Sequence, residues 1–137
     1  MAKVSIACIA IKRGKILIAH RNPKGQMGAR WEFPGGKVEE GEDEKVSIVR
    51  EMQEEFGVNV KVLKKITENN FEHDGIKFNL HVYQIAFPRM GLLKKFKLTE
   101  HTEYRWVKID DIPKDNFVDS DLKVFDDVKK YIENKSS

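Results

Sequence analysis

The stretch GKVEEGEDEKVSIVREMQEEFGV, residues 36–58, concentrates negative charge on one predicted helix. Its residues 43–56 have helical spacing, and a glycine follows them as a natural C-terminal stop. Glu51, Glu54 and Glu55 fall within two turns of this helix, and like charges at such spacing destabilise it. The three carboxylates therefore need a positive partner.

One face of the predicted helix is apolar. At about 100° per residue, Val46, Val49, Met52 and Phe56 fall on one arc and are expected to pack on the core. The three glutamates lie nearly opposite that arc by the same count, so they are expected to share one outward face. Many solvated helices carry such a face, so helical geometry alone leaves an acidic surface helix as an open alternative.

The loop before the helix supplies further oxygen ligands. Phe33-Pro34-Gly35-Gly36 can bend sharply and bring backbone carbonyls close to a ligand, because glycine has no side chain to obstruct the approach. Mg²⁺ and Mn²⁺ prefer oxygen ligands, and three carboxylates with a loop carbonyl offer only oxygen. Bound cations would relieve the repulsion among the glutamates, so the pattern predicts a metal site.

The spacing within residues 36–58 resembles the Nudix box. In that box a glycine, a glutamate, an Arg-Glu pair, a Glu-Glu pair and a second glycine stand at fixed intervals, and one aliphatic residue follows the Arg-Glu pair and another the second glycine. Every position is matched, by Gly36, Glu42, Arg50, Glu51, Met52, Glu54, Glu55, Gly57 and Val58. Chance would give such a match in roughly one window per billion at average residue usage. The resemblance implies an α/β/α sandwich with a mixed β-sheet.

The resemblance also implies a reaction and a set of site residues. Nudix enzymes hydrolyse a nucleoside diphosphate linked to another group, and they use divalent metal ions. The implied ligands of Mg²⁺, for which Mn²⁺ can substitute, are the carbonyl of Gly36 and the side chains of Glu51, Glu54, Glu55 and Glu100. Arg50 is expected to orient a carboxylate rather than touch the substrate. Glu42 is either a further acid behind the ligands or a residue of the helix start, and the general base is either Glu51 or Glu100.

Two stretches resemble the MutT branch of the family, whose members act on oxidised nucleotides such as 8-oxo-dGTP. They are AHRNPKGQMGAR, residues 19–30, and WEFPGGKVEEGE, residues 31–42. The substrate-binding residues that this resemblance implies are Arg21, Phe33, Lys37 and Asn116. Asn116 would read the purine edge, since an amide offers both a donor and acceptors. The open alternatives are a helix-capping role for Asn116 and a core role for Phe33.

These features predict a Mg²⁺-dependent nucleoside triphosphate pyrophosphatase, which converts a (d)NTP into a (d)NMP and pyrophosphate, with 8-oxo-dGTP as the leading substrate. FEHDGIKFNLHVY, residues 71–83, resembles equally the members that act on CTP, dCTP or 5-methyl-dCTP. Another alternative is a non-catalytic Nudix module that senses a nucleotide, although such modules often lose box glutamates and none is missing here. LLKKFK, residues 92–97, is the only basic and aromatic stretch suited to RNA, so no nucleic acid partner is expected.

The rest of the chain indicates strands around the acidic helix. Strand-like patterns occupy residues 4–11, 15–20, 58–66, 77–87 and 103–109. Residues 21–42 are expected to be mostly loop, with a short extended piece at 31–33. Residues 119–134 are expected to form an amphipathic closing helix with a stripe of Leu122, Phe125, Val128 and Ile132. This order favours a mixed sheet covered by helices, an α/β or α+β fold.

Length and composition favour one globular domain, residues 1–137, with 40% hydrophobic and 34% charged residues. No segment has the length of a membrane span or the pattern of a signal peptide, which predicts a cytoplasmic protein without a membrane partner. Residues 39–55 hold eight acids and two bases, a local charge of −6, whereas the whole chain carries +3 and the remainder therefore +9. This distribution suits a cation site whose surroundings attract an anionic small molecule, such as a nucleotide. A monomer and a homodimer are both compatible with the sequence.

Overall fold

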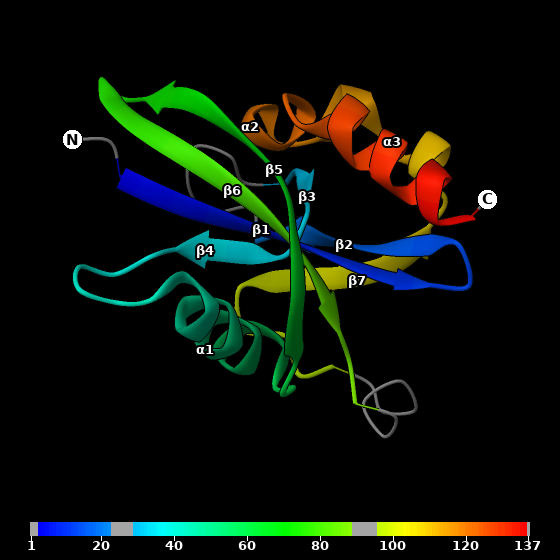
Figure 1. Cartoon of the computed structure of the whole chain (residues 1–137), viewed down its shortest axis with the longest axis horizontal. Helices are drawn as coiled ribbons and strands as arrows, with labels where there is room; N and C mark the ends of the chain where they lie inside the picture. Colours follow the sequence, from blue (N-terminus) through cyan, green and yellow to red (C-terminus); the bar gives the residue numbers. More distant parts are fainter. Residues whose placement is uncertain (1–2, 23–28, 89–95, 137) are drawn as a thin grey trace.

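In the computed structural model of the protein, residues 3–22, 29–88 and 96–136 are described. Helix α1 (Glu44–Phe56) covers one face of a sheet. Helices α2 (Asp119–Leu122) and α3 (Phe125–Ser136) cover the opposite face (Figure 1). The predicted fold class, an α/β/α sandwich with a mixed sheet, is confirmed.

The described residues form a seven-stranded sheet. Its strands are β1 (Lys3–Lys12), β2 (Lys15–Arg21), β3 (Trp31–Glu32), β4 (Gly35–Lys37), β5 (Lys61–His73), β6 (Ile76–Ala86) and β7 (His101–Val107). The main path runs β3-β2-β1-β6-β5, while β4 pairs with β1 and β7 with β2. Strands β1 and β6 are parallel, and the other neighbouring pairs are antiparallel. The acidic loop and helix thus leave the sheet beside its central strand β1.

The central strand β1 is apolar on both faces because both faces are covered. Ile6, Cys8 and Ala10 belong to the core cluster that contains helix α1. Ala7 and Ile9 belong to the cluster that contains helix α3. The alternation of the strand therefore divides one apolar run between two cores, and each core holds its helix against the sheet.

Helix α1 begins and ends as its sequence predicts. The side chain of Asp43 caps the first turn by accepting the N–H of Lys45 at 3.1 Å. Gly57 has φ 66°, in the left-handed region, and its N–H donates to the carbonyl of Gln53 at 3.0 Å. These caps fix the length of the helix that carries the box glutamates.

The apolar stripe of helix α1 is rotated by roughly 50° around the helix axis from the predicted one, at about 100° per residue. Its buried residues are Ser47, Ile48, Met52, Glu55 and Phe56. Val46 and Val49, which were predicted to face the core, are 56% and 38% exposed, so that prediction was wrong. The true apolar stripe is Ile48, Met52 and Phe56, at intervals of four residues. As a result, the acidic side of the helix turns partly toward the sheet instead of outward.

Three element boundaries also differ from the prediction. Residues 35–37, predicted as loop, form β4, because they pair with β1. Strand β5 continues to His73 instead of ending at residue 66, because its polar second half pairs with β6 at the sheet edge. The closing helix is split between α2 and α3, and Leu122 in α2 is only partly buried while Phe125, Val128 and Ile132 are buried as predicted.

None of the helices in the described part of the chain is both long and apolar enough to cross a bilayer. Four residues of the basic stretch LLKKFK, 92–95, lie outside the described residues.

The orientation of helix α1 can be tested with two matched truncations. Ile48→Ala removes a fully buried side chain and should lower the free energy of unfolding by about 2–5 kcal/mol. Val49→Ala, one residue along on the exposed side, should change it by about 0.5 kcal/mol or less. Urea denaturation measures both values. Equal losses, or a larger loss for Val49→Ala, would contradict the observed orientation.

Candidate active site

A cavity of about 460 Å³ is lined by strands of the sheet, by helix α1 and by the start of helix α2. Eight of the residues that the sequence assigns to the site line it, namely Arg21, Phe33, Gly36, Lys37, Glu51, Glu54, Glu55 and Glu100. Two do not, Arg50 and Asn116. Segments far apart in the sequence therefore meet at one hollow, which contains the acidic side of α1.

Gly36 and Glu51 approach each other closely in this cavity. A Cβ atom on Gly36 would lie 2.4 Å from the carboxyl carbon of Glu51, closer than any side chain allows. Gly36 is also held against β1, where it pairs with Ile6, and its carbonyl accepts the hydroxyl of Ser5 at 3.3 Å. A side chain at position 36 would therefore displace the carboxyl group of Glu51 from its place over this backbone.

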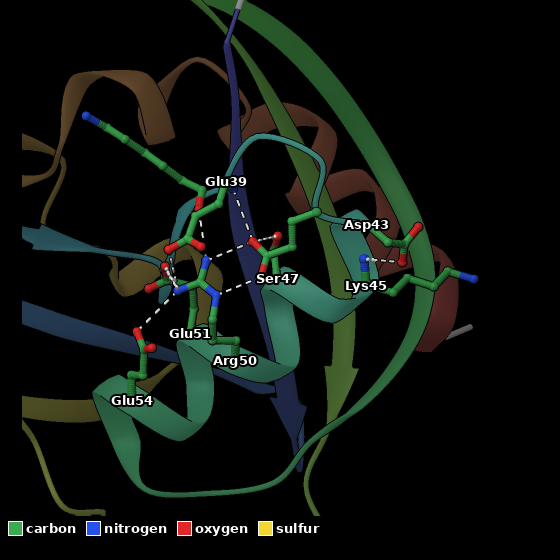
Figure 2. Close-up of polar contacts among 9 residues, drawn as sticks. Glu39, Asp43, Lys45, Ser47, Arg50, Glu51 and Glu54 are labelled. Atoms are coloured by element: carbon green, nitrogen blue, oxygen red, sulfur yellow. Dashed lines mark hydrogen bonds and ion pairs between the residues drawn. The ribbon is translucent and has the colours of Figure 1, made fainter.

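Arg50 lies at the centre of a network of carboxylates. Its Nη1 donates to Glu51 at 2.8 Å and to Glu54 at 3.2 Å, as Figure 2 shows. Its Nε and Nη2 donate to the two oxygens of Glu42 at 2.7 and 3.0 Å. Its Nη2 also donates to the carbonyl of Lys37 at 3.3 Å. These contacts support the expectation that Arg50 orients carboxylates, since a guanidinium offers five donors in a fixed plane.

Glu42 belongs to the same network. Hydrogen bonds from Arg50 and then from the hydroxyl of Ser47 lower the pKa of Glu42 to about 2. Its carboxylate also accepts the N–H of Glu39 at 3.1 Å, within the turn before α1. Glu42 therefore combines the two roles that the sequence left open, since it organises the approach to the helix and holds Arg50 in place.

Glu55 is the buried acid of the site. It is 7% exposed, and burial raises its pKa to about 9, with further contributions from Glu32, Glu51 and Glu100. Its Oε2 has no hydrogen-bond partner among the described residues. Burial likewise raises the pKa of Glu51. A buried carboxyl oxygen without a partner is energetically costly, so the site around Glu55 favours the binding of a cation.

Asp121 also lines the cavity and was not predicted. It is 5% exposed, and its Oδ2 accepts the backbone N–H of Phe33 at 2.9 Å. Burial raises its pKa well above the usual range, and a protonated carboxyl can donate as well as accept. One sequence signal pointed to it. Asp121 stands four and seven residues before Phe125 and Val128, so an acid shares the register of the predicted apolar stripe.

Asn116 lies away from the cavity. It is exposed and ends a 3₁₀ turn, Lys114–Asn116, where its N–H donates to the carbonyl of Pro113 at 2.9 Å. It does not cap the following helix either, because the residue before α2 is Val118. The structure brings Asp121, five residues further along the chain, to the position where the sequence expected a polar reader of the base.

The other predicted substrate residues have mixed environments. Phe33 is 2% exposed and packs edge to face on Phe117 at 5.2 Å, so it is a core residue that also reaches the cavity wall. Lys37 is exposed, with its Nζ 5.3 Å from the ring centre of Phe78. Arg21 donates to Glu32 at 3.0 Å. Each therefore has a structural contact in addition to its place at the cavity.

Comparison with known proteins identifies the family. A family model described as NUDIX domain matches residues 1–128. The chain belongs to the Nudix family. The prediction from the box is therefore confirmed at the level of the family.

Among curated Nudix relatives, a CTP pyrophosphohydrolase of Escherichia coli (strain K12) is 35% identical over 80 residues, which cover 58% of this chain and 59% of that protein. An 8-oxo-dGTP diphosphatase of Buchnera aphidicola subsp. Schizaphis graminum (strain Sg) is 32% identical over 124 residues, 90% of this chain and 91% of that protein. Some matches are partial, since the chain spans 59% of the first relative and 51% of an 8-oxo-dGTP diphosphatase of Proteus vulgaris.

A solved structure of a Nudix relative has a similar fold. The solution NMR structure of DNA mismatch repair protein MutT from methicillin-resistant Staphylococcus aureus 252, described as a Nudix hydrolase, superposes with a TM-score of 0.71. It is 31% identical, and the match covers 96% of this chain and 99% of that chain. The family and these relatives support the prediction of a hydrolase that acts on pyrophosphate bonds.

The donor chemistry of this Nudix site fits a hard divalent cation, because a buried carboxyl oxygen without a partner lies beside two further carboxylates. The side chains are nevertheless not arranged as a finished ligand set. Within the described residues, no three His, Cys, Asp or Glu side chains are grouped to hold a metal ion. Glu51 and Glu54 are instead bonded to Arg50. A cation would therefore bind these carboxylates beside Arg50, which bonds one oxygen of each, or in its place.

The metal fit can be tested with Glu55→Gln. The pKa of Glu55 is raised from 4.5 to about 9 in the folded protein. Between these two pH values Glu55 ionises in the unfolded state but not in the folded state, so the free energy of unfolding falls as the pH rises. The neutral amide avoids this cost, so the metal-free variant should have a higher Tm than wild type at pH 8. The variant should also lose most of the Mg²⁺-induced gain, which for wild type is about 2.7 kcal/mol at 100 times the Kd.

Thermal unfolding with and without Mg²⁺ measures both effects. Glu40→Gln, at an exposed acid before helix α1 that does not line the cavity, serves as the matched control and should behave like wild type. A Mg²⁺-induced gain of equal size in Glu55→Gln and wild type would show that Glu55 does not bind the cation.

Proposed function

We propose that this Nudix protein is a Mg²⁺-dependent nucleoside triphosphate pyrophosphatase, which converts a (d)NTP into a (d)NMP and pyrophosphate. One observation carries the proposal. One cavity is lined by the three acids of helix α1 and also by Phe33 and by Asp121, a polar group suited to a nucleobase. A triphosphate and its base therefore have complementary groups in one hollow.

The acids of the cavity are the proposed cation ligands. Glu51, Glu54 and Glu55 would hold Mg²⁺, or Mn²⁺ in its place, with the Gly36 carbonyl and Glu100 as further ligands. Mg²⁺ supplies two things when bound, neutralisation of phosphate charge and acidification of a water molecule. The charge of +9 outside residues 39–55 supports this reading, because it attracts a polyphosphate to the acidic site.

The side chains around the acids have separate tasks in this proposal. Lys37 and Arg21 contact the phosphates, and Arg50 keeps Glu51 and Glu54 from spreading apart. Either Glu51 or Glu100 takes the proton from the attacking water. Burial raises the pKa of Glu51, which makes its carboxylate a stronger base and supports this choice. Glu100 has the competing support of lying on the cavity wall next to the buried Glu55.

Asp121 is the proposed reader of the base, in place of Asn116. An oxidised purine such as that of 8-oxo-dGTP has gained an N–H, and a buried carboxyl next to Phe33 can pair with both donors and acceptors. The relative from Buchnera aphidicola, aligned over 90% of this chain, is an 8-oxo-dGTP diphosphatase and supports 8-oxo-dGTP as the leading substrate. CTP or dCTP is the second candidate, favoured by the 35% identity to a CTP pyrophosphohydrolase.

The proposal includes the domain organisation, the cellular compartment and the oligomeric state. A single domain, residues 1–137, would act on free nucleotides in the cytoplasm as a monomer or homodimer, without a nucleic acid or membrane partner. A non-catalytic sensor module is the alternative class, and the intact set of box glutamates argues against it.

A panel of nucleotides with Mg²⁺ tests the proposal directly. The panel contains 8-oxo-dGTP, dGTP, CTP, dCTP, ADP-ribose and a dinucleoside polyphosphate, and the products are identified by chromatography. The expected result is a nucleoside monophosphate and pyrophosphate, with the highest kcat/KM for 8-oxo-dGTP. Release of inorganic phosphate alone, or turnover restricted to ADP-ribose, would contradict it.

The reading of the base is tested by Asp121→Ala. Loss of a buried hydrogen-bonding partner costs about 1–3 kcal/mol, so kcat/KM for the preferred nucleotide should fall by about 5- to 150-fold. The loss for poorly used nucleotides should be smaller. Asn116→Ala is the matched control and should leave every kcat/KM unchanged, because Asn116 is exposed away from the cavity. Equal losses across all bases in Asp121→Ala would remove its role in selectivity.

A further inference from the structure

At one wall of the cavity, side chains from three neighbouring strands form a second charged network. Glu32 of β3 accepts a hydrogen bond from Nη1 of Arg21, in β2, at 3.0 Å. Its other oxygen accepts from Nε2 of His101, in β7, at 2.8 Å. The side chains of Glu32 and His101 are 12% and 1% exposed. Both oxygens of a buried carboxylate are thus engaged, and one partner, His101, has no assigned role.

A β-bulge brings His101 into this network. Arg21 pairs with His101 and His20 pairs with Glu103, so Thr102 is the extra residue of β7. Such bulges re-aim side chains near functional sites. His101 is accordingly turned inward, and its ring stacks on Phe56 of helix α1 at 5.3 Å with an interplanar angle of 30°. The ring therefore connects β7 with the end of the helix that carries the box glutamates.

The residue before His101 is Glu100, which lines the cavity. Its carbonyl accepts the N–H of Asn22 at 3.2 Å. The preceding Thr99 donates its N–H to the carbonyl of Glu55 at 3.3 Å and its hydroxyl to the carbonyl of Glu54 at 2.9 Å. Backbone contacts thus hold the segment on one side, and the buried ring of His101 holds it on the other.

We propose that His101 is a positioning residue, which fixes Glu100 at the cavity by bonding to Glu32 and stacking on Phe56. The inference rests on the proposed function, in which Glu100 is a candidate general base and cation ligand. The imidazole acts through one donor, because Nδ1 is buried and has no hydrogen-bond partner among the described residues. Loss of the Nε2–H bond would leave a buried oxygen of Glu32 unpaired and would free the start of β7 to shift.

Two substitutions separate positioning from packing. His101→Gln keeps an N–H near the position of Nε2, whereas His101→Phe keeps a flat ring on Phe56 and removes the donor. Displacement of a reacting group by about 1 Å can cost up to about 100-fold in rate, so His101→Phe should lower kcat by this order with KM nearly unchanged. His101→Gln should restore most of kcat. His20→Phe is the matched control, because His20 bonds the neighbouring Thr102, and it should leave kcat unchanged.

A double variant tests whether the effect acts through Glu100. His101→Phe should cause no further loss of kcat in a Glu100→Gln background, because the group that it positions is already disabled. Losses that multiply, equal losses for His101→Gln and His101→Phe, or an unchanged kcat in His101→Phe would each overturn the proposal. If His101→Phe does not fold, His101→Met replaces it, since Met also fills the space without a donor.

Amide hydrogen exchange in the metal-free protein gives a readout without catalysis. The amides of Asn22 and Thr99 should exchange about tenfold faster in His101→Phe than in wild type, and at the wild-type rate in His101→Gln and His20→Phe. Unchanged exchange in His101→Phe would show that His101 does not hold the segment. If the wild type hydrolyses no nucleotide, the proposed function fails, and exchange alone then decides the role of His101.

Discussion

The close approach of strand β4 to its neighbours is the constraint on which the site depends. A Cβ atom on Gly35 would lie 1.9 Å from the carbonyl oxygen of Ile6, and one on Gly36 would collide with the carboxyl group of Glu51. Only glycine permits the first contact, which is with backbone, whereas the second would displace the Glu51 side chain. Because β4 lies this close to β1, helix α1 can place acidic side chains against the backbone of the loop, and the cavity acquires its oxygen-rich wall.

The acids of the box differ in the positive charge that lies beside them. Glu42 is bonded to Arg50, and its pKa falls to about 2, so it is a stable carboxylate at any physiological pH. Glu55 is buried without a comparable partner, and its pKa rises to about 9. The burial of Glu55 therefore lowers the stability of the ligand-free protein, which is typical of a ligand-binding site. Arg50 bonds both Glu42 and Glu51, and Glu51 is one of the acids that raise the pKa of Glu55.

The sequence predicted the fold class, the limits of helix α1 and the family, because these follow from a complete motif and clear caps. The sequence-based predictions were wrong for features that depend on tertiary contacts. The rotation of α1 depends on which of several apolar residues meets the sheet, and Val46 and Ile48 look alike in sequence. The second half of β5 is polar and is ordered by pairing with β6, which apolar periodicity does not reveal. Asp121 lies in the short helix α2, whereas the sequence predicted one continuous helix over residues 119–134.

The most direct measurement is a crystal structure with Mn²⁺ and a non-hydrolysable nucleoside triphosphate, in which anomalous scattering locates the cation. The account predicts Mn²⁺ bound to the carboxylates of Glu51, Glu54 and Glu55, in contact with phosphate oxygens and with the base near Asp121. Mn²⁺ and phosphates bound outside this cavity, with Glu51 and Glu54 still bonded to Arg50, would contradict it.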